Sequence, residues 1–492
     1  MTSSLLITWL IAFCCSSLLA QNLPVGTILE ARLSNATGSR ISHRGDPVEA
    51  TVIAPVYVKG RTLVPPGSKI FGSVSEVKRL GLGLKYATAS LGYEFNSLRL
   101  SNGETVPVHL QLLQVETAKE HVDRDGIVRG IHPIVGLSSG LSFFTVPLSF
   151  LSPVVSVPVW GMKSVIAPSA NPEIYFPQGT EVFLRLTVGA NVPYSNVDVS
   201  RIAAFSPGEA TQVQRSLSSL EQRRAYLGTR PSDWVNLVFI GSRKQMNRAF
   251  QSAGWTEAHG RSPVSLYCMY LALTKRKGYP KAPMNTLTLN GIPSDFVYQK
   301  SLDTVEKRHH VRLWKDPQRP DVWLGAAAED VGFQFKLAHW THSTDPNIDS
   351  ERAKVINDLS FTGCLDTAGL LPRASSGGAP SNRAVHTAWT DGQIAVVQLN
   401  SCVHPAVMAG ARFSSVPYQH GRPYRILRSF RDDLVRSNIF FMTYNTIRAV
   451  TKDRDKQRRI TVTDADLRNL SWVNSLSAVH ANASLAHTDS TQ

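Results

Sequence analysis

Short runs of alternating apolar and polar residues, separated by turns that contain glycine and proline, fill the chain from residue 24 to residue 188. The strand-like runs are 26–33, 48–57, 63–72, 95–100, 105–113 and 174–188. Asn102-Gly103 is a tight-turn signal and predicts a hairpin between two of them. Short strands at this spacing are typical of an all-β barrel or sandwich, which we predict for residues 24–188.

The pattern changes after residue 188. Ser206 followed by Pro207 is typical of a helix start, so residues 189–232 are predicted to be a linker that holds one helix. From residue 233 onward, strand-like and helix-like segments mix. A chain of 492 residues is also too long for one hydrophobic core. The sequence therefore predicts a multi-domain protein: an N-terminal all-β barrel or sandwich, an α+β domain over 233–450, and a polar tail over 451–492.

One apolar stretch, residues 131–162, contains no Lys, Arg, Asp or Glu. Its length is sufficient to span a bilayer. Four prolines interrupt it, however, and proline breaks an ideal membrane helix. Two interpretations stay open: a hairpin-like insertion that touches a membrane, or a buried loop that packs on the barrel.

Residues 1–20 have the pattern of an export signal, with an apolar run at 5–13 and Ala20 at its end. The usual basic residues before the apolar run are missing, so a retained N-terminal anchor is the alternative. We expect an exported protein, periplasmic or membrane-associated in the bacterial envelope. In that compartment we predict a Cys364–Cys402 disulfide; the alternative is that both and Cys268 are unpaired buried thiols.

Composition narrows the class of partner. An apolar fraction of 42% and a charged fraction of 18% are ordinary for a folded protein. The net charge of +15 attracts anionic surfaces. No RRM, helix-turn-helix or zinc-finger spacing accompanies it, so a membrane or an envelope polyanion is the expected partner. The sequence has no Cys-x-x-Cys pair, which argues against a structural zinc held by thiolates.

The first domain carries motifs of a known family. Residues 26–33, 45–48 (Gly-Asp-Pro-Val) and 63–68 (Leu-Val-Pro-Pro-Gly-Ser), followed by Gly72, resemble the TrbI-like barrel of conjugation and type IV secretion machines. The resemblance implies an envelope scaffold with partners in a secretion assembly, and not an enzyme. In that family an insertion at a similar place forms a membrane-facing antenna, which favours membrane contact for residues 131–162.

The second domain resembles the LssY C-terminal domain over about residues 230 to 367. The motifs that carry this resemblance are 236–241 (Asn-Leu-Val-Phe-Ile-Gly), 253–255 (Ala-Gly-Trp), 308–314 (Arg-His-His-Val-Arg-Leu-Trp), 322–327 (Val-Trp-Leu-Gly-Ala-Ala) and 341–352. The resemblance implies a bacterial envelope protein, often attached to membrane segments, and settles no activity. The chain has no phosphatase motif and no G-x-S-x-G nucleophile elbow.

Residues 308–314 are predicted to form a strand, on which side chains alternate between two faces. Arg308, His310 and Arg312 then share one face, and guanidinium groups on such a face suit carboxylate or phosphate anions. His309 lies on the opposite, core-facing side as a buried, hydrogen-bonded histidine. The alternative for the Arg/His face is a set of ion pairs with the acidic residues Asp345, Asp349 and Glu351.

A divalent metal site is a sharper hypothesis for the same region. His342, Asp345 and Asp349 offer one imidazole and two carboxylates within eight residues, and His310 could add a nitrogen. Such sets suit iron, zinc or manganese. The competing interpretation is a helix terminus, in which Asp345-Pro346 begins the helix and Asp349 pairs with Arg352 at i, i+3.

These observations favour a membrane-associated envelope protein that acts as a structural or binding module with an anion-recognising Arg/His face. The alternative function is a metal-dependent hydrolase of a phosphorylated or lipid-like envelope substrate.

Overall fold

The computed structural model describes residues 20–58, 61–81, 88–116, 120–130, 153–166, 173–193, 205–218, 224–275, 279–302, 307–336, 339–372, 390–402, 410 and 420–436. The predicted export signal, apart from Ala20, and the predicted polar tail lie outside these residues. So do residues 131–152 of the apolar stretch.

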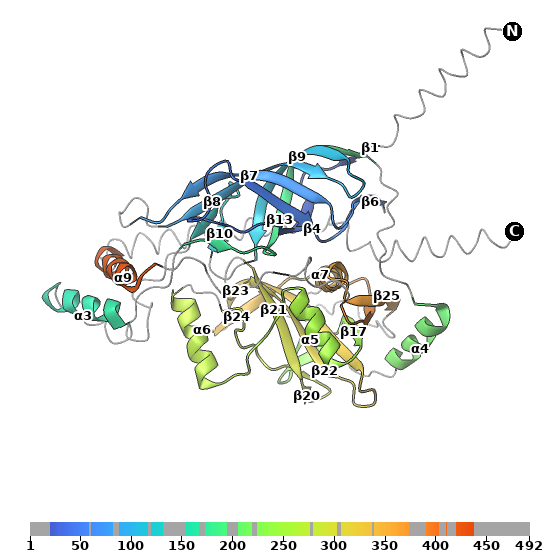
Figure 1. Cartoon of the computed structure of the whole chain (residues 1–492). Helices are drawn as coiled ribbons and strands as arrows, with labels where there is room; N and C mark the ends of the chain where they lie inside the picture. The colour runs from blue at the N-terminus through green and yellow to red at the C-terminus, as the bar shows by residue number, and fades with distance from the viewer. Residues whose placement is uncertain are drawn as a thin grey trace, which may run out of the picture.

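The N-terminal domain is a closed barrel of six antiparallel strands (Figure 1). Its strands are β2 (Ile28–Leu33), β4 (Pro47–Val52), β7 (Lys69–Lys78), β8 (Ser90–Arg99), β9 (Thr105–Val115) and β13 (Glu181–Val188). They follow the order β8-β7-β4-β2-β13-β9, and β9 closes the ring on β8. The predicted hairpin is present, because Gly103 adopts φ 90° and its N–H donates to the Leu100 carbonyl at 2.9 Å.

Smaller strands extend and flank the barrel. They are β1 (Ala20–Leu23), β3 (Thr37–Gly38), β5 (Val56–Val58), β6 (Arg61–Val64), β10 (Glu120–Val122), β11 (Val128–Gly130), β12 (Tyr175–Phe176) and β14 (Ala190–Pro193). Strand β2 shows which side chains face the inside of the barrel. Leu29, Ala31 and Leu33 point into the barrel core, whereas Glu30 and Arg32 alternate with them and point outward.

The second domain is built on a mixed eight-stranded sheet. The strands are β17 (Leu237–Ile240), β18 (Thr256–Glu257), β21 (Phe296–Leu302), β22 (Lys307–Lys315), β23 (Val322–Lys336), β24 (His339–Thr344), β25 (Leu365–Pro372) and β26 (Gln393–Leu399). The order is β18-β21-β22-β23-β17-β26-β25, with β24 also on β23. Only the β17–β26 pairing is parallel among these described strands.

Apolar side chains cover both faces of this sheet. Helices α5 (Arg243–Ser252) and α7 (Ile348–Phe361) pack on one face through residues such as Phe250 and Val355. The other face is covered by α4 (Pro207–Ser218) and by a small sheet of β15 (Arg224–Leu227), β16 (Arg230–Trp234), β19 (Thr288–Leu289) and β20 (Ile292–Pro293). The predicted fold class, an all-β barrel followed by an α+β domain, is confirmed.

Helix α7 lies between the barrel and the sheet of the second domain (Figure 1). It is therefore buried on its charged side as well as on its apolar side. It begins at Ile348 with Asn347 as its N-cap, whose side chain accepts from the backbone N–H of Asp349 at 3.2 Å. The predicted start at Asp345-Pro346 is thus two residues too early.

The remaining helices are α3 (Pro153–Ile166), α6 (Pro263–Lys275) and α9 (Arg422–Arg436). Helix α3 is the described end of the apolar stretch, and it packs against α9 (Figure 1). Pro158 is accommodated inside it. Among the described residues, every helix is too short or too polar to cross a bilayer.

Candidate functional site

The strand that carries the predicted anion-binding face is β22, and both of its faces are buried. Val311 and Leu313 join the core beneath α5 and α7, whereas Trp314 joins the core on the opposite face. The predicted alternation is confirmed. Arg308, His310 and Arg312 are only 8%, 2% and 6% exposed.

The Arg/His face is already occupied by carboxylates from the protein itself. Arg308 Nε donates to Asp330 Oδ2 at 2.9 Å. His310 Nε2 lies 3.3 Å from Asp233 Oδ2, and Arg312 donates to the same oxygen. Burial opposes ionisation of Asp233, but Arg312 and His310 hold the pKa of its carboxyl well below the usual value. These contacts come from Asp233 of β16 and Asp330 of β23. Pairing of this face with Asp345, Asp349 and Glu351 stays a prediction.

The predicted metal ligands do not form a group among the described side chains. Asp349 accepts from Thr390 and from the backbone N–H of Asp391, and lies 3.1 Å from Arg352, which is the helix pair given as the alternative. Asp345 Oδ1 accepts from the backbone N–H of Asn347 at 2.7 Å. The backbone of His342 pairs with Phe333 on β23, and its side chain lies outside the described set.

A different imidazole–carboxylate group is present one residue away. His309 Nδ1 lies 2.7 Å from Glu351 Oε2, which confirms the predicted buried, hydrogen-bonded histidine. Glu329 completes the group, with ligand-capable atoms of all three residues within 4.8 Å of one another. Burial opposes the charge on His309, but Glu351 raises the pKa of the imidazole to about 9. Burial likewise raises the pKa of Glu329 to about 7.

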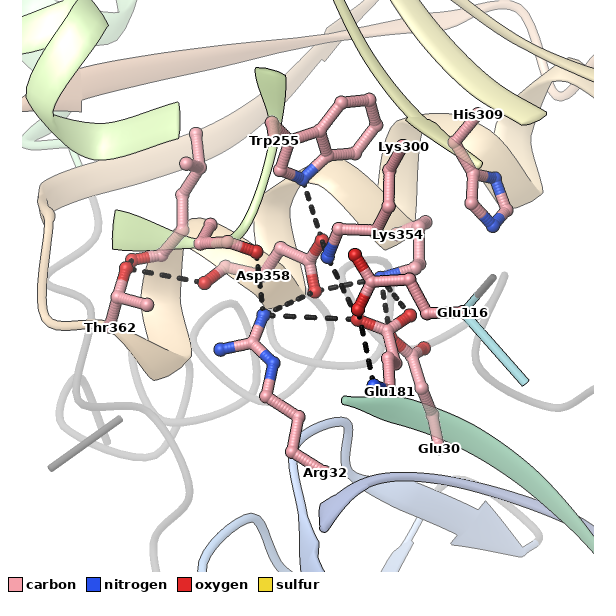
Figure 2. A network of polar contacts seen from close by, with 12 residues as sticks. Glu30, Arg32, Glu116, Glu181, Trp255, Lys300, His309, Lys354, Asp358 and Thr362 are labelled. Carbon is pink, nitrogen blue, oxygen red and sulfur yellow. Dashed lines mark hydrogen bonds and ion pairs between the residues drawn. The ribbon is translucent and has the colours of Figure 1, made fainter. Parts of the chain in front are cut away.

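A network of ion pairs joins the two domains in the described part of the chain (Figure 2). The barrel contributes Glu30, Arg32, Glu116 and Glu181, and the second domain contributes Lys300, Lys354 and Asp358. All seven side chains are buried. Figure 2 shows Arg32, Glu30 and Glu181 on the barrel side, with Asp358 and the two lysines facing them.

Two lysines hold the network together. Lys354 Nζ lies 2.6 Å from Glu30 Oε1, 2.8 Å from Glu181 Oε1 and 2.7 Å from Asp358 Oδ1. Lys300 Nζ donates to Glu181 at 2.8 Å and to Asp358 at 2.9 Å. Trp255 Nε1 donates to Asp358 Oδ2 at 2.8 Å, the same oxygen that accepts from Lys300. Each lysine therefore joins carboxylates from both domains.

The electrostatics of the network follow from its burial. Desolvation raises the pKa of Glu30 to about 8 and that of Glu116 to about 7. Burial also opposes ionisation of Glu181, but Lys300, Lys354 and Arg32 hold the pKa of this carboxyl well below its usual value. Protonation of Glu30 leaves three cations facing three carboxylates. A closely paired, nearly neutral network of this kind avoids the large cost of an uncompensated buried charge.

This network was not predicted from the sequence, for a physical reason. Glu30 and Arg32 occupy the polar positions of an alternating strand, which ordinarily face water. A signal was present on α7, where Lys354 and Asp358 fall at i, i+4 and so lie on one helix face.

The fold and this network define a two-domain protein in which a closed barrel is joined to a mixed-sheet domain through buried ion pairs. The family model described as LssY C-terminus matches residues 217–394, which supports the family predicted for the second domain. Among solved structures, ComB10 of the Com type IV secretion system of Helicobacter pylori is similar at 15% identity. The match covers 36% of this chain and 94% of the ComB10 chain, with a TM-score of 0.22. The TrbI-like resemblance of the barrel stays a prediction. The comparison with curated proteins found no match.

Proposed function

We propose that this protein is an exported, membrane-associated module of the bacterial envelope, and that helix α3 is its membrane-contacting element. The observation that carries this proposal is an apolar stripe on α3 that faces solvent. Its members are Val154, Val155, Met162, Val165 and Ile166, which are 83%, 41%, 64%, 49% and 60% exposed. Their spacing places them along one side of a helix.

The orientation of α3 is the reverse of that expected for a helix on a soluble surface. Its polar residues Lys163 and Ser164 are buried, at 3% and 0% exposure, while the apolar side is open. Leu427 and Leu434 of α9, the helix that packs against α3, are also exposed. Exposed apolar patches mark interaction surfaces.

A lipid surface is the occupant that we propose for this patch. Fourteen residues of helix extend about 21 Å, which is shorter than the roughly 30 Å hydrocarbon core, so α3 would lie in the interface. Arg422, an exposed residue of α9, donates to the Val165 carbonyl at 3.5 Å and thus places a cation beside the stripe. The net charge of +15 favours an anionic membrane.

Vesicle flotation of the full chain tests the proposal. We expect binding to vesicles of phosphatidylglycerol and phosphatidylethanolamine, and weaker binding to phosphatidylcholine alone. Val154→Asp combined with Met162→Asp should reduce partitioning at least about tenfold. Leu227→Asp, at a 45% exposed position on β15, is the matched control and should bind like wild type. If the double variant floats normally, or only converts a dimer to a monomer, the proposal is wrong.

The interdomain ion network supports the structural part of this function. It commits seven buried side chains to joining the barrel to the second domain, and the LssY C-terminus match adds an envelope family for that domain. Protein partners in a secretion assembly are part of the proposal through the TrbI-like resemblance. The anion-recognition role of Arg308, His310 and Arg312 stays a separate prediction, since an incoming anion has to compete with Asp233 and Asp330.

A second candidate function is a metal-dependent hydrolase of a phosphorylated or lipid-like envelope substrate. One observation favours it, namely the group formed by His309, Glu329 and Glu351. Phosphate release or ester hydrolysis that depends on added metal, and that is lost in Glu329→Gln, would support this alternative.

A further inference from the structure

Two groups of side chains in the described part of the chain have ligand atoms close enough to hold a cation. They differ in whether a lysine ammonium already lies among the ligand atoms. In the group of Glu30, Glu181 and Asp358, the position between the carboxylates is already taken by the ammonium of Lys354. In the group of His309, Glu329 and Glu351, the ion pair is that of His309 with Glu351. The charges of Lys354 and Lys307 act on His309 and Glu329, respectively.

Part of the ligand capacity in this second group is unused. His309 Nε2 and Glu351 Oε1 are buried and have no hydrogen-bond partner among the described residues. The two side chains are only 5% and 3% exposed. A buried polar atom without a partner is costly. The ring of His309 also contacts the rings of Phe183 and Trp255, with centroid distances of 6.4 and 6.3 Å.

We propose that His309, Glu329 and Glu351 form a binding site for one divalent transition-metal ion such as Zn²⁺ or Mn²⁺. One imidazole and two carboxylates are a donor set that suits these ions. Metal–ligand distances of about 2.0–2.2 Å place ligand atoms within about 4.4 Å of each other. One ligand atom from each of the three residues lies within 4.8 Å of the other two, which is close to this span.

The three ligands come from two strands and a helix, which makes the site a product of the tertiary fold. His309 and Glu329 are direct partners across β22 and β23, and Glu351 reaches them from the first turn of α7. Glu329 is the least buried of the three ligands. The open coordination positions would hold water or a substrate oxygen.

Metal content of the untagged full chain tests this proposal. After dialysis against EDTA and titration with Zn²⁺ or Mn²⁺, we expect one ion per chain by calorimetry and elemental analysis. Glu329→Gln and Glu351→Gln should each weaken binding at least tenfold. Glu30→Gln removes a buried carboxylate from the neighbouring network and should bind the ion like wild type. Co²⁺ substitution should give visible absorption bands that Glu329→Gln abolishes.

Unfolding midpoints measured without metal separate ligand loss from misfolding. Glu329 is the most exposed of the three ligands, so Glu329→Gln should keep the wild-type midpoint and decide the question. Absence of stoichiometric metal binding in wild type would overturn the proposal. Undiminished binding in both glutamine variants would also overturn it. Loss of binding in His342→Ala, with both glutamine variants unaffected, would overturn it as well. The vesicle assay reads a different surface, so either proposal can fail alone.

Discussion

The ammonium group of Lys300 in the second domain lies 2.8 Å from the carboxylate of Glu181 in the barrel, and both side chains are fully buried. Asp358 on α7 accepts from the same ammonium at 2.9 Å. One lysine thus links a barrel strand, a sheet strand and the helix between the domains.

Lys300→Met removes that link and leaves Glu181 and Asp358 buried with less positive charge. We expect a loss of about 3–5 kcal/mol in the free energy of unfolding, because breaking a buried pair exposes an uncompensated charge to a low-dielectric environment. Chemical denaturation measures the change. Lys69→Met is the matched control at an exposed Lys–Glu pair of equal length, 2.8 Å, and should cost at most about 1 kcal/mol. Equal effects of the two changes would contradict this account.

The raised pKa of Glu30 predicts how the stability of the folded protein depends on pH. Its pKa is raised by burial to about 8 in the folded protein, above the unfolded value near 4.5. The folded state therefore binds more protons in this window, and the contribution of Glu30 to stability falls as pH rises from about 4.5 to 8. Lys354, Glu181 and Asp358 face this carboxyl.

Glu30→Gln mimics the protonated form and should remove this part of the slope, so that the variant gains stability relative to wild type as pH rises. Thermal unfolding midpoints across pH 5 to 8 measure it, where the pH range follows from the pKa of about 8. Glu94→Gln, at an exposed position on β8, should keep the wild-type slope. Parallel curves for wild type and Glu30→Gln would refute the assignment.

The Cys364–Cys402 disulfide is the predicted pair, and it closes a 38-residue separation. We expect the double change to alanine to cost about 2–4 kcal/mol, mainly by releasing the unfolded chain. A reducing agent should lower the unfolding midpoint of wild type and leave the double variant unchanged. Cys268→Ser, at the free cysteine among the described residues, should behave as wild type in both conditions.

A substitution at Asp233 tests whether the predicted anion-binding face recognises anions. Asp233→Asn leaves Arg312 and His310 without their shared carboxylate. If this face can recognise anions, inorganic phosphate should raise the unfolding midpoint of Asp233→Asn by several degrees more than that of wild type. A double variant that also carries Arg312→Met should lose the phosphate effect. No difference between Asp233→Asn and wild type would remove anion recognition from the description of this face.

Local patterns along the chain determined much of the fold. Alternation and the Asn102-Gly103 turn predicted the barrel strands, and Ser206-Pro207 predicted the start of α4. The alternation of β22 correctly placed His309 in the core. These predictions succeed because hairpin turns, helix starts and strand faces depend on neighbours in sequence.

Only the tertiary structure decided which charges are buried together. The sequence left open whether Arg308, His310 and Arg312 form an anion-binding face or an ion-paired one. The small sheet that contains β15 and β16 brings Asp233 onto His310 and Arg312. Glu30 and Glu181 occupy positions that would face water in an isolated barrel, and α7 of the second domain covers them. His309 and Glu351 meet across 42 residues because α7 packs on the sheet that contains β22. Partner choice among charged groups depends on how elements and domains pack together, which leaves no periodic trace in the sequence.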